Sequence, residues 1–133
     1  MLFDYFKNIN DTFGHNTGDE FLIEMTKLLK SRVRASDSLF RFGGEEFAII
    51  LPNTDEDGAI LVAEIIRKAI EVLTIKWDSH DIPLTVSIGI SVAIVDSDDH
   101  PTILLDQADK ALYQAKRGGR NKVCLYSAES EAS

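Results

Sequence analysis

The chain has 133 residues, and its 22 Asp and Glu outnumber its 14 Lys and Arg, which leaves a formal net charge of −8 at pH 7. This length suits one domain with a buried core, and no apolar run approaches the roughly 20 residues of a membrane span. The acidic balance argues against a nucleic-acid or anionic-membrane surface. We therefore expect neither nucleic acid nor membrane as a partner of this segment.

Cysteine usage indicates a reducing compartment. Cys124 is the one cysteine of the chain, so an internal disulfide is impossible. Its apolar neighbours favour a small core residue over a reactive thiol. Residues 1–10 lack the basic start and long apolar stretch of a signal peptide. We expect a cytoplasmic location, or the cytoplasmic part of a larger protein that carries a sensor or membrane domain elsewhere.

The start of the chain predicts the end of a strand and then helical structure. Residues 1–3 are an apolar triplet, too short for a complete buried strand, so we expect the chain to be a piece of a longer polypeptide. Residues 4–14 predict a short helical turn and a loop. Asn16 or Thr17 is a suitable N-cap for the following helix, whose apolar stripe runs to about Val33.

Residues 34–52 predict a hairpin. The apolar residues Leu39, Phe40 and Phe42 lead into it, and the β-prone run at 47–51 leads out and stops at a proline. Gly43 and Gly44 supply the turn, because glycine takes positive φ without a Cβ clash.

Two adjacent carboxylates, Glu45 and Glu46, follow that turn. Adjacent strand residues point to opposite faces, so one of the two faces any given partner. A glutamate beside two glycines allows a bulky anion to approach the backbone while a divalent cation neutralises it, as in a metal–nucleotide site. For the bare G-G-E-E pattern a solvated acidic turn is the more common structure, and on these residues alone both interpretations stay open.

The middle of the chain predicts a helix and then a central strand. The helix starts at residues 54–57, where acidic side chains suit its positive end, and it ends near Thr74. A short edge strand is expected at 75–77. Residues 84–94 alternate bulky apolar with small side chains, which predicts a strand with another element packed closely on its small face.

The last part predicts one more helix and one more strand. The helix starts at Pro101 and ends at Gly118-Gly119. A strand follows at 122–126, and residues 127–133 are expected to form a frayed tail. This order of elements predicts a single α+β domain with a mixed central sheet flanked by helices.

Four blocks of the sequence, in the same order, resemble the GGDEF domain family, the diguanylate cyclases. The resemblance covers about Asp4 to about Tyr126. The blocks are Phe6-Lys7-Asn8-Ile9-Asn10-Asp11 with Gly14-His15 and Gly18-Asp19, then Gly43-Gly44-Glu45-Glu46-Phe47, then Thr85-Val86-Ser87-Ile88-Gly89, then Ala108 to Lys116 closing on Gly119-Arg120-Asn121. The resemblance implies a nucleotidyl-cyclase-like, ferredoxin-related fold over residues 1–126, without the family's usual N-terminal helix and most of its first strand.

The resemblance also implies a guanine site. A carboxylate can accept from the N1–H and the exocyclic amine of guanine, and an amide adds a further hydrogen bond. The positions that match Asn10 and Asp19 do this work in the family. Each residue alone also suits a structural role, Asn10 in a turn and Asp19 at a helix start.

The implied triphosphate site combines backbone and side chains. Backbone amides of Tyr5, Phe6 and Lys7 resemble the family's phosphate cradle, an anion-binding nest. Lys116 and Arg120 resemble the cations that reach the γ-phosphate, although basic residues near a helix C-terminus also complement its dipole. Gly43 and Gly44 would let the substrate approach the hairpin closely.

The implied metal site holds Mg²⁺ or Mn²⁺. The family's ligands match the Glu45 side chain, the Phe3 backbone carbonyl, and an aspartate at the position that Leu2 occupies here. Leucine offers no oxygen, and Asp4 lies two residues further on. We therefore expect weak activity from this chain. Glu46 is assigned a further catalytic or metal-associated role.

A separate pair, Arg34 and Asp37, matches the family's inhibitory R-x-x-D site, where the arginine and the aspartate contact the product. The bare pattern is common and otherwise predicts a surface ion pair worth about 0–1 kcal/mol.

The function implied is condensation of two GTP into cyclic di-GMP with release of two pyrophosphates. One domain would hold one GTP, so catalysis would need a homodimer, with cyclic di-GMP as product and inhibitor. Glu45, Glu46, Lys116 and Arg120 would be the catalytic residues. A receptor that binds cyclic di-GMP or GTP without catalysis is the alternative, and a purely structural dimerisation module is a third.

Overall fold

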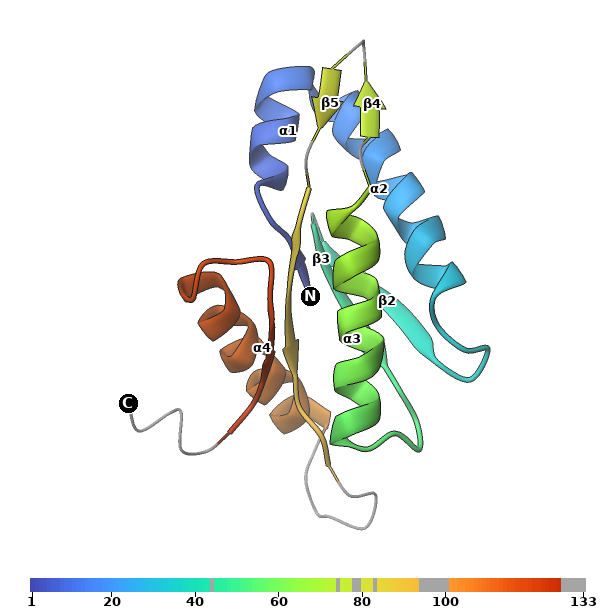
Figure 1. The fold of residues 1–133 in the computed structure, drawn as a ribbon, viewed down its shortest axis with the longest axis vertical. Coiled ribbons are helices and arrows are strands. Elements are labelled where there is room, and N and C mark those ends of the chain that lie inside the picture. Colours follow the sequence, from blue (N-terminus) through green and yellow to red (C-terminus); the bar gives the residue numbers. More distant parts are fainter. Residues whose placement is uncertain (44, 74, 78–79, 83, 94–100, 128–133) are drawn as a thin grey trace.

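The computed structural model describes residues 1–43, 45–73, 75–77, 80–82, 84–93 and 101–127. A five-stranded sheet in the order β2-β3-β1-β6-β7 forms the centre, and a two-stranded β4-β5 ribbon projects from one end (Figure 1). The elements are β1 (Leu2–Phe3), α1 (Phe6–Phe13), α2 (His15–Ser31), β2 (Ser38–Gly43), β3 (Glu46–Ile50), α3 (Glu56–Glu71), β4 (Ile75–Trp77), β5 (His80–Ile82), β6 (Val86–Ile90), α4 (Pro101–Arg117) and β7 (Val123–Leu125).

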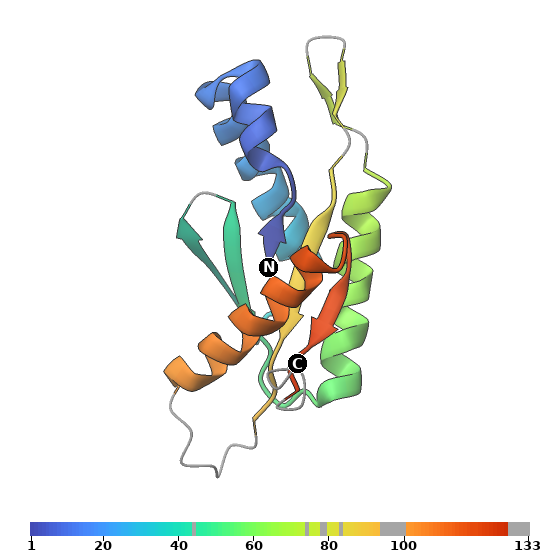
Figure 2. The ribbon, with the colours of Figure 1, turned by 90° about the vertical axis from the view of Figure 1, so that its left-hand side faces the viewer.

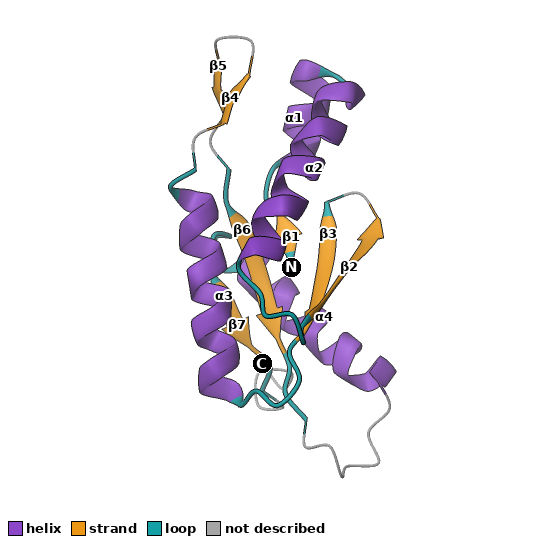
Figure 3. Ribbon diagram, turned by 90° about the vertical axis from the view of Figure 1, so that its right-hand side faces the viewer, coloured by secondary structure: helices purple, strands orange, loops and turns teal. Residues whose placement is uncertain are grey.

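The helices cover both faces of the sheet. Figure 2 shows α4 in front of the strands, and Figure 3, from the opposite side, shows α2 and α3 in front. Helix α1 packs on α2 rather than on the sheet. The arrangement is the mixed sheet flanked by helices that the order of elements predicts.

The short strand β1 lies between the two halves of the sheet. Leu2 pairs with Glu46 of β3 on one side and with Ser87 of β6 on the other, both antiparallel. β6 then pairs with β7 in parallel. The expected strand structure near the start of the chain is confirmed at Leu2–Phe3, and this strand lies in the middle of the sheet.

An aromatic cluster anchors β1 to the layer beneath it. The Phe3 ring is buried and meets Phe21 of α2 edge-on at 6.0 Å and Phe47 of β3 edge-on at 5.6 Å between ring centroids. Edge-to-face pairs of this kind add about 0.5–1.5 kcal/mol beyond area burial. The position of β1, and of the turn that follows it, is therefore fixed by packing from two other elements.

Helix α4 packs very closely on β6. A Cβ built on Gly89 would lie 2.2 Å from the backbone oxygen of Ala108 and 2.3 Å from the backbone nitrogen of Leu112. Ala111 and Ala115 of α4 are fully buried. The predicted close approach on the small face of this strand is confirmed. The strand itself is shorter than the predicted 84–94: it spans Val86–Ile90, residues 84–85 and 91–93 are not strand, and residues 94–100 lie outside the described part of the chain.

The predicted boundaries at the start of the chain are wrong in two places. Residues 6–13 form a regular two-turn helix instead of a turn and loop. Helix α2 begins at His15, directly after Gly14 at φ 91°, and not after Asn16 or Thr17. Thr17 is buried inside the helix, so its side chain is unavailable as a cap. The glycine breaks the helical path because this backbone conformation interrupts it without a Cβ penalty.

The later boundaries agree more closely with expectation. Asp55 caps α3 by accepting a hydrogen bond from the Gly58 N–H at 2.8 Å, and the helix ends at Glu71. Helix α4 ends before Gly118, as predicted. No helix in the described residues is both long enough and apolar enough to cross a bilayer. The predicted tail lies almost wholly outside the described residues.

Candidate functional site

The tip of the β2–β3 hairpin lies beside β1. Gly43 pairs with Glu46 after an irregularity in the register, and the Glu45 carbonyl accepts a hydrogen bond from the Phe3 N–H at 3.2 Å. Glu45 and the backbone of Phe3, the two predicted metal-binding groups, are therefore neighbours in the structure. Gly44 lies outside the described residues.

The first turn of α1 presents free backbone donors. Tyr5 has φ 63° and ψ 20°, a left-handed conformation that costs a non-glycine residue roughly 1–2 kcal/mol. The N–H groups of Tyr5, Phe6 and Lys7 donate to no acceptor among the described residues. A left-handed residue that leads into a helix with several unpaired N–H groups is the geometry of an anion nest. Tyr5, Phe6 and Lys7 therefore present unpaired backbone donors on one turn, and their binding of phosphate stays a prediction.

The buried side chain of Asp4 holds this turn in place through hydrogen bonds. Its side chain is 1% exposed and accepts hydrogen bonds from Thr85 Oγ1 and Ser87 Oγ, both at 2.7 Å, and from the Asn121 backbone N–H at 3.1 Å. A buried carboxyl group with three donors is well satisfied. Its oxygens are committed to the fold, so Asp4 is not available to replace the metal-binding aspartate that Leu2 lacks.

The C-terminus of α4 delivers Arg120 to the same turn. The Arg120 N–H bonds to the Ala115 carbonyl at 3.0 Å and the Gly119 N–H to the Lys116 carbonyl at 3.4 Å. These are the two bonds of a Schellman motif, with Gly119 at φ 113° in the left-handed position. The Arg120 guanidinium lies 5.0 Å from the Tyr5 ring centroid, within the range of a cation–π contact.

The predicted base-recognition residues lie on α1 and α2. Asn10 Oδ1 is buried and has no hydrogen-bond partner among the described residues. A Cβ on Gly18 would lie 1.8 Å from that oxygen, so α2 leaves room for Asn10 only because residue 18 is glycine. Asp19 is exposed on the same helix, in its second turn rather than its first. An unpaired buried acceptor costs about 1–3 kcal/mol, and such costs concentrate at functional sites.

The metal-binding groups are sparse. In the part of the chain that the structure describes, no three His, Cys, Asp or Glu side chains gather as a metal site. Glu45 is one carboxylate, Leu2 offers none, and Asp4 is occupied. Mg²⁺ in nucleotide sites is commonly held by one or two carboxylates together with substrate phosphates and water. The residues present fit an ion that arrives with a triphosphate, and do not form a cage of their own.

Arg34 and Asp37 form a closed turn at the other end of the hairpin. Arg34 Nη2 donates to Asp37 Oδ1 at 2.7 Å, to the Pro52 carbonyl at 2.9 Å and to Thr54 Oγ1 at 2.9 Å. The Asp37 side chain is covered, while that of Arg34 is about half exposed. The hydrogen bond to Asp37 raises the pKa of Arg34, and the same bond lowers the pKa of Asp37.

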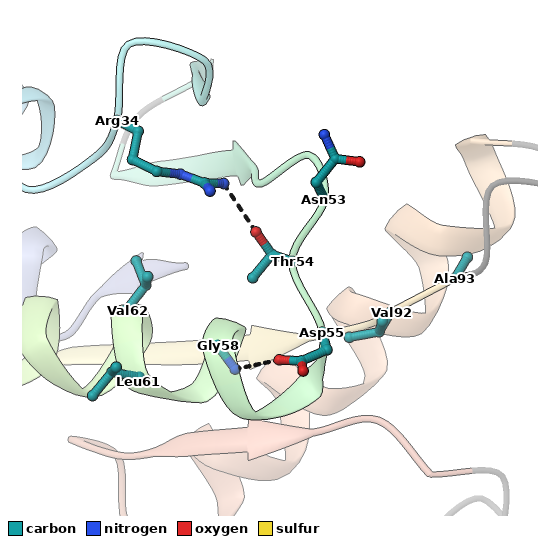
Figure 4. Close-up of a pocket in the computed structure, with 9 residues that line it drawn as sticks. All are labelled: Arg34, Asn53, Thr54, Asp55, Gly58, Leu61, Val62, Val92 and Ala93. Atoms are coloured by element: carbon teal, nitrogen blue, oxygen red, sulfur yellow. Dashed lines mark hydrogen bonds between the residues drawn. The ribbon is translucent and has the colours of Figure 1, made fainter.

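An open pocket of about 680 Å³ adjoins this turn (Figure 4). The Thr54 hydroxyl points toward the Arg34 guanidinium and bonds to it, and the exposed Asn53 also lines the pocket. Apolar side chains of α3 and of the segment after β6 complete the lining: Leu61, Val62, Val92 and Ala93. A cation beside an apolar floor suits a ligand with both phosphate and a flat ring.

Residues 1–122 match the family described as diguanylate cyclase, GGDEF domain. The chain belongs to the GGDEF domain family. Curated relatives of this GGDEF domain include diguanylate cyclase A of Treponema denticola, 48% identical over 92% of the chain, and diguanylate cyclase DosC of Escherichia coli K12, 44% identical over 94%. The chain spans a third or less of the length of these relatives, 33% and 27%.

Solved structures of the family agree with the fold of this GGDEF domain. The GGDEF domain of DgcB from Caulobacter crescentus, in complex with c-di-GMP, has a TM-score of 0.86 at 33% identity and covers 93% of this chain and 73% of that one. The active GGEEF domain of a diguanylate cyclase from Vibrio cholerae has a TM-score of 0.81 at 38% identity and covers 95% and 79%. The predicted α+β GGDEF fold is confirmed.

Sequence reasoning missed the contacts that hold the turn at Asp4–Tyr5 of this GGDEF domain. The Tyr5–Arg120 stack joins residues at opposite ends of the chain. The hydroxyls of Thr85 and Ser87 were identified as small side chains but not as donors to Asp4. Two polar side chains on the inner face of a central strand were the available signal, because buried hydroxyls need a partner.

Proposed function

We propose that this domain binds GTP and, as a pair of domains, condenses two GTP into cyclic di-GMP and two pyrophosphates. The observation that carries the proposal is that the Arg120 guanidinium stacks on the ring of Tyr5, the residue that opens the run of free N–H groups at Tyr5–Lys7. Backbone donors and an arginine at one place provide the oriented positive charge that a triphosphate requires.

Each residue has a stated role in this proposal. Asn10 and Asp19 bind the guanine edge, and Arg120, together with Lys116 in the last turn of α4, binds the terminal phosphates. Gly43 and Gly44 keep the hairpin tip clear for the nucleotide. Each of two 3′-hydroxyls attacks the α-phosphorus of the other GTP, and the bond from that phosphorus to the pyrophosphate oxygen breaks.

Glu45 would hold the divalent ion, Mg²⁺ or Mn²⁺, with the Phe3 carbonyl and the phosphates. When bound, the ion supplies charge neutralisation and polarisation of the attacking hydroxyl. Glu46, paired with Leu2, would support Glu45 from the adjacent strand position. The two-domain arrangement follows from the reaction, because one domain offers a single set of guanine and phosphate groups.

A receptor without catalysis is the second candidate. The absence of a carboxylate at Leu2 and the burial of Asp4 favour it, since together they leave Glu45 as the single carboxylate proposed for the ion. The turn of Arg34 and Asp37, with its adjoining pocket, would then bind cyclic di-GMP as a signal. In the enzyme the same site would provide product inhibition.

One experiment separates the two candidates. The chain is incubated with GTP and Mg²⁺, the products are separated by chromatography, and GTP binding is measured by calorimetry on the same preparation. Cyclic di-GMP with pyrophosphate supports the cyclase. Cyclic di-GMP binding is measured in the same way. Binding of GTP or cyclic di-GMP without turnover supports the receptor, and absence of binding and turnover contradicts both.

A further inference from the structure

Arg67, on α3, joins the end of that helix to the turn after α4. Its guanidinium donates to Glu64 through Nε and Nη2, at 2.9 Å for Nη2 to Oε2, and through Nη1 to Glu71 Oε2 at 3.0 Å and Asn121 Oδ1 at 3.2 Å. The Arg67 side chain is 15% exposed. A planar guanidinium that is fixed by two carboxylates presents its remaining donor in one direction, here toward Asn121.

Asn121 transmits this contact to the floor of the phosphate turn. Its side-chain amide donates to Glu71 and accepts from Arg67, while its backbone N–H donates to Asp4 Oδ2. Arg120 directly precedes Asn121, and Tyr5 directly follows Asp4. The two residues that meet in the cation–π stack are therefore each one peptide bond away from the Asn121–Asp4 contact.

The backbone at this turn needs such support. Arg120 has φ 64° and Asn121 φ 48°, two consecutive residues in the left-handed region, neither of them glycine. Conformations of this kind persist where surrounding contacts over-determine them. The Schellman bonds hold the turn from the side of α4, and the Arg67–Glu71–Asn121 contacts hold it from the side of α3.

We propose that Arg67 is a positioning residue for triphosphate binding, which acts through Asn121 to hold Arg120 above Tyr5 and the free N–H groups of α1. The inference rests on the proposed GTP site and adds a remote helix to it. Arg67 bonds to Asn121 rather than to the base-recognition residues. Loss of Arg67 therefore lowers the affinity for phosphates and leaves the affinity for guanosine unchanged.

The test measures the affinity of three probes: inorganic triphosphate with Mg²⁺, GTP with Mg²⁺, and guanosine. Arg67→Met is compared with the unmodified chain and with Lys68→Met, which removes the same charge from the neighbouring exposed position of α3. We expect triphosphate and GTP affinity to fall about tenfold in Arg67→Met, a factor that corresponds to 1.4 kcal/mol. Guanosine affinity stays constant, and Lys68→Met resembles the unmodified chain.

Asn121→Gly provides a second variant that separates positioning from folding. Glycine accepts the left-handed backbone and keeps the N–H to Asp4, but it removes the side chain that contacts Arg67 and Glu71. We expect the same loss of triphosphate affinity, with no further loss in the double variant, because both changes break one linkage.

The outcomes distinguish the inference from the function on which it rests. Equal triphosphate affinity in Arg67→Met and Lys68→Met, or equal loss for triphosphate and guanosine, overturns the positioning role while the GTP site stands. Triphosphate binding that depends on Arg67, without preference for GTP over ATP, supports the positioning role and removes the proposed guanine specificity. Failure of the unmodified chain to bind triphosphate or GTP rejects both.

Discussion

Leu2 is the residue at which this chain departs from the metal site that its family resemblance implies. Leu2 lies between β3 and β6 without an oxygen ligand, and Asp4 is held by Thr85, Ser87 and Asn121. We therefore expect the unmodified chain to turn over GTP very slowly. Leu2→Asp, with the strand extended upstream, should raise the rate by orders of magnitude in single-turnover assays with Mg²⁺. Brisk synthesis by the unmodified chain would show that another group binds the ion.

Asp19 is the residue predicted to select the base. Its carboxylate is exposed on α2, one position beyond the glycine that accommodates Asn10. Adenine lacks the N1–H donor that a carboxylate can accept, so we expect GTP to bind more tightly than ATP. Asp19→Ser should bring the two affinities together. Calorimetry with both nucleotides checks this, and equal affinities in the unmodified chain would contradict it.

Between elements, the contact of α4 with β6 leaves no room for a larger side chain at Gly89. A Cβ on Gly89 would overlap the backbone of Ala108 and Leu112, which cannot move as a flexible side chain does. We expect Gly89→Ala to lower the free energy of unfolding by about 1–3 kcal/mol, the typical cost of overpacking. Urea denaturation measures it. Ser91→Ala, two positions along the strand, serves as a control that loses a single hydrogen bond to the Leu104 carbonyl.

The turn from Arg34 to Asp37 is the second element with a testable role. Arg34→Ala and Asp37→Ala should each weaken cyclic di-GMP binding by more than a surface ion pair explains, because charge-assisted contacts to phosphate and base are lost. Lys30→Ala, an exposed basic residue at the end of α2, is the matched control. Unchanged affinity in both variants, measured by calorimetry, would exclude the product site.

Periodicity predicted the elements better than their ends. The alternation at residues 84–94 is a local pattern, and β6 forms within it; α3 and α4 likewise form within the ranges predicted for them. The α1–α2 boundary was wrong because Gly14, and not a polar cap, separates the helices. The motif blocks located the candidate site, but the Arg67–Asn121 contact joins residues 54 positions apart. No local pattern states which charged residue of a helix touches a distant turn.

At the scale of the whole molecule, two carboxylates of α3 link the stability of this acidic chain to pH. Hydrogen bonds from Arg67 lower the pKa of Glu64, and hydrogen bonds from Asn121 lower the pKa of Glu71. A carboxyl group whose pKa is lower in the folded state stabilises the fold above its unfolded pKa of about 4.3, and this contribution is lost as the pH falls through the lower folded value.

We therefore expect the difference in urea midpoint between the unmodified chain and Glu64→Gln to have its largest value at pH 7. It should shrink steadily below about pH 4. Glu24→Gln, on the exposed face of α2, should show a smaller difference at every pH because its partner Lys27 is well exposed. A Glu64→Gln difference that stays constant down to pH 2 would contradict this linkage.

The two-residue strand β1 also determines how the domain opens. Within the described sheet, β1 joins the β2–β3 hairpin to β6 and β7 through pairings at Leu2 and Phe3. Because this connection is so short, we expect the hairpin and the α3–α4–β6–β7 body to unfold locally as separate units, with amide hydrogens of β3 exchanging sooner than those of β6. Separation of the hairpin from β1 would move Glu45 away from Tyr5. A nucleotide that contacts both the hairpin and the β6–β7 side would stabilise the domain against this local unfolding. Amide exchange in β3 would then become slower when the nucleotide binds.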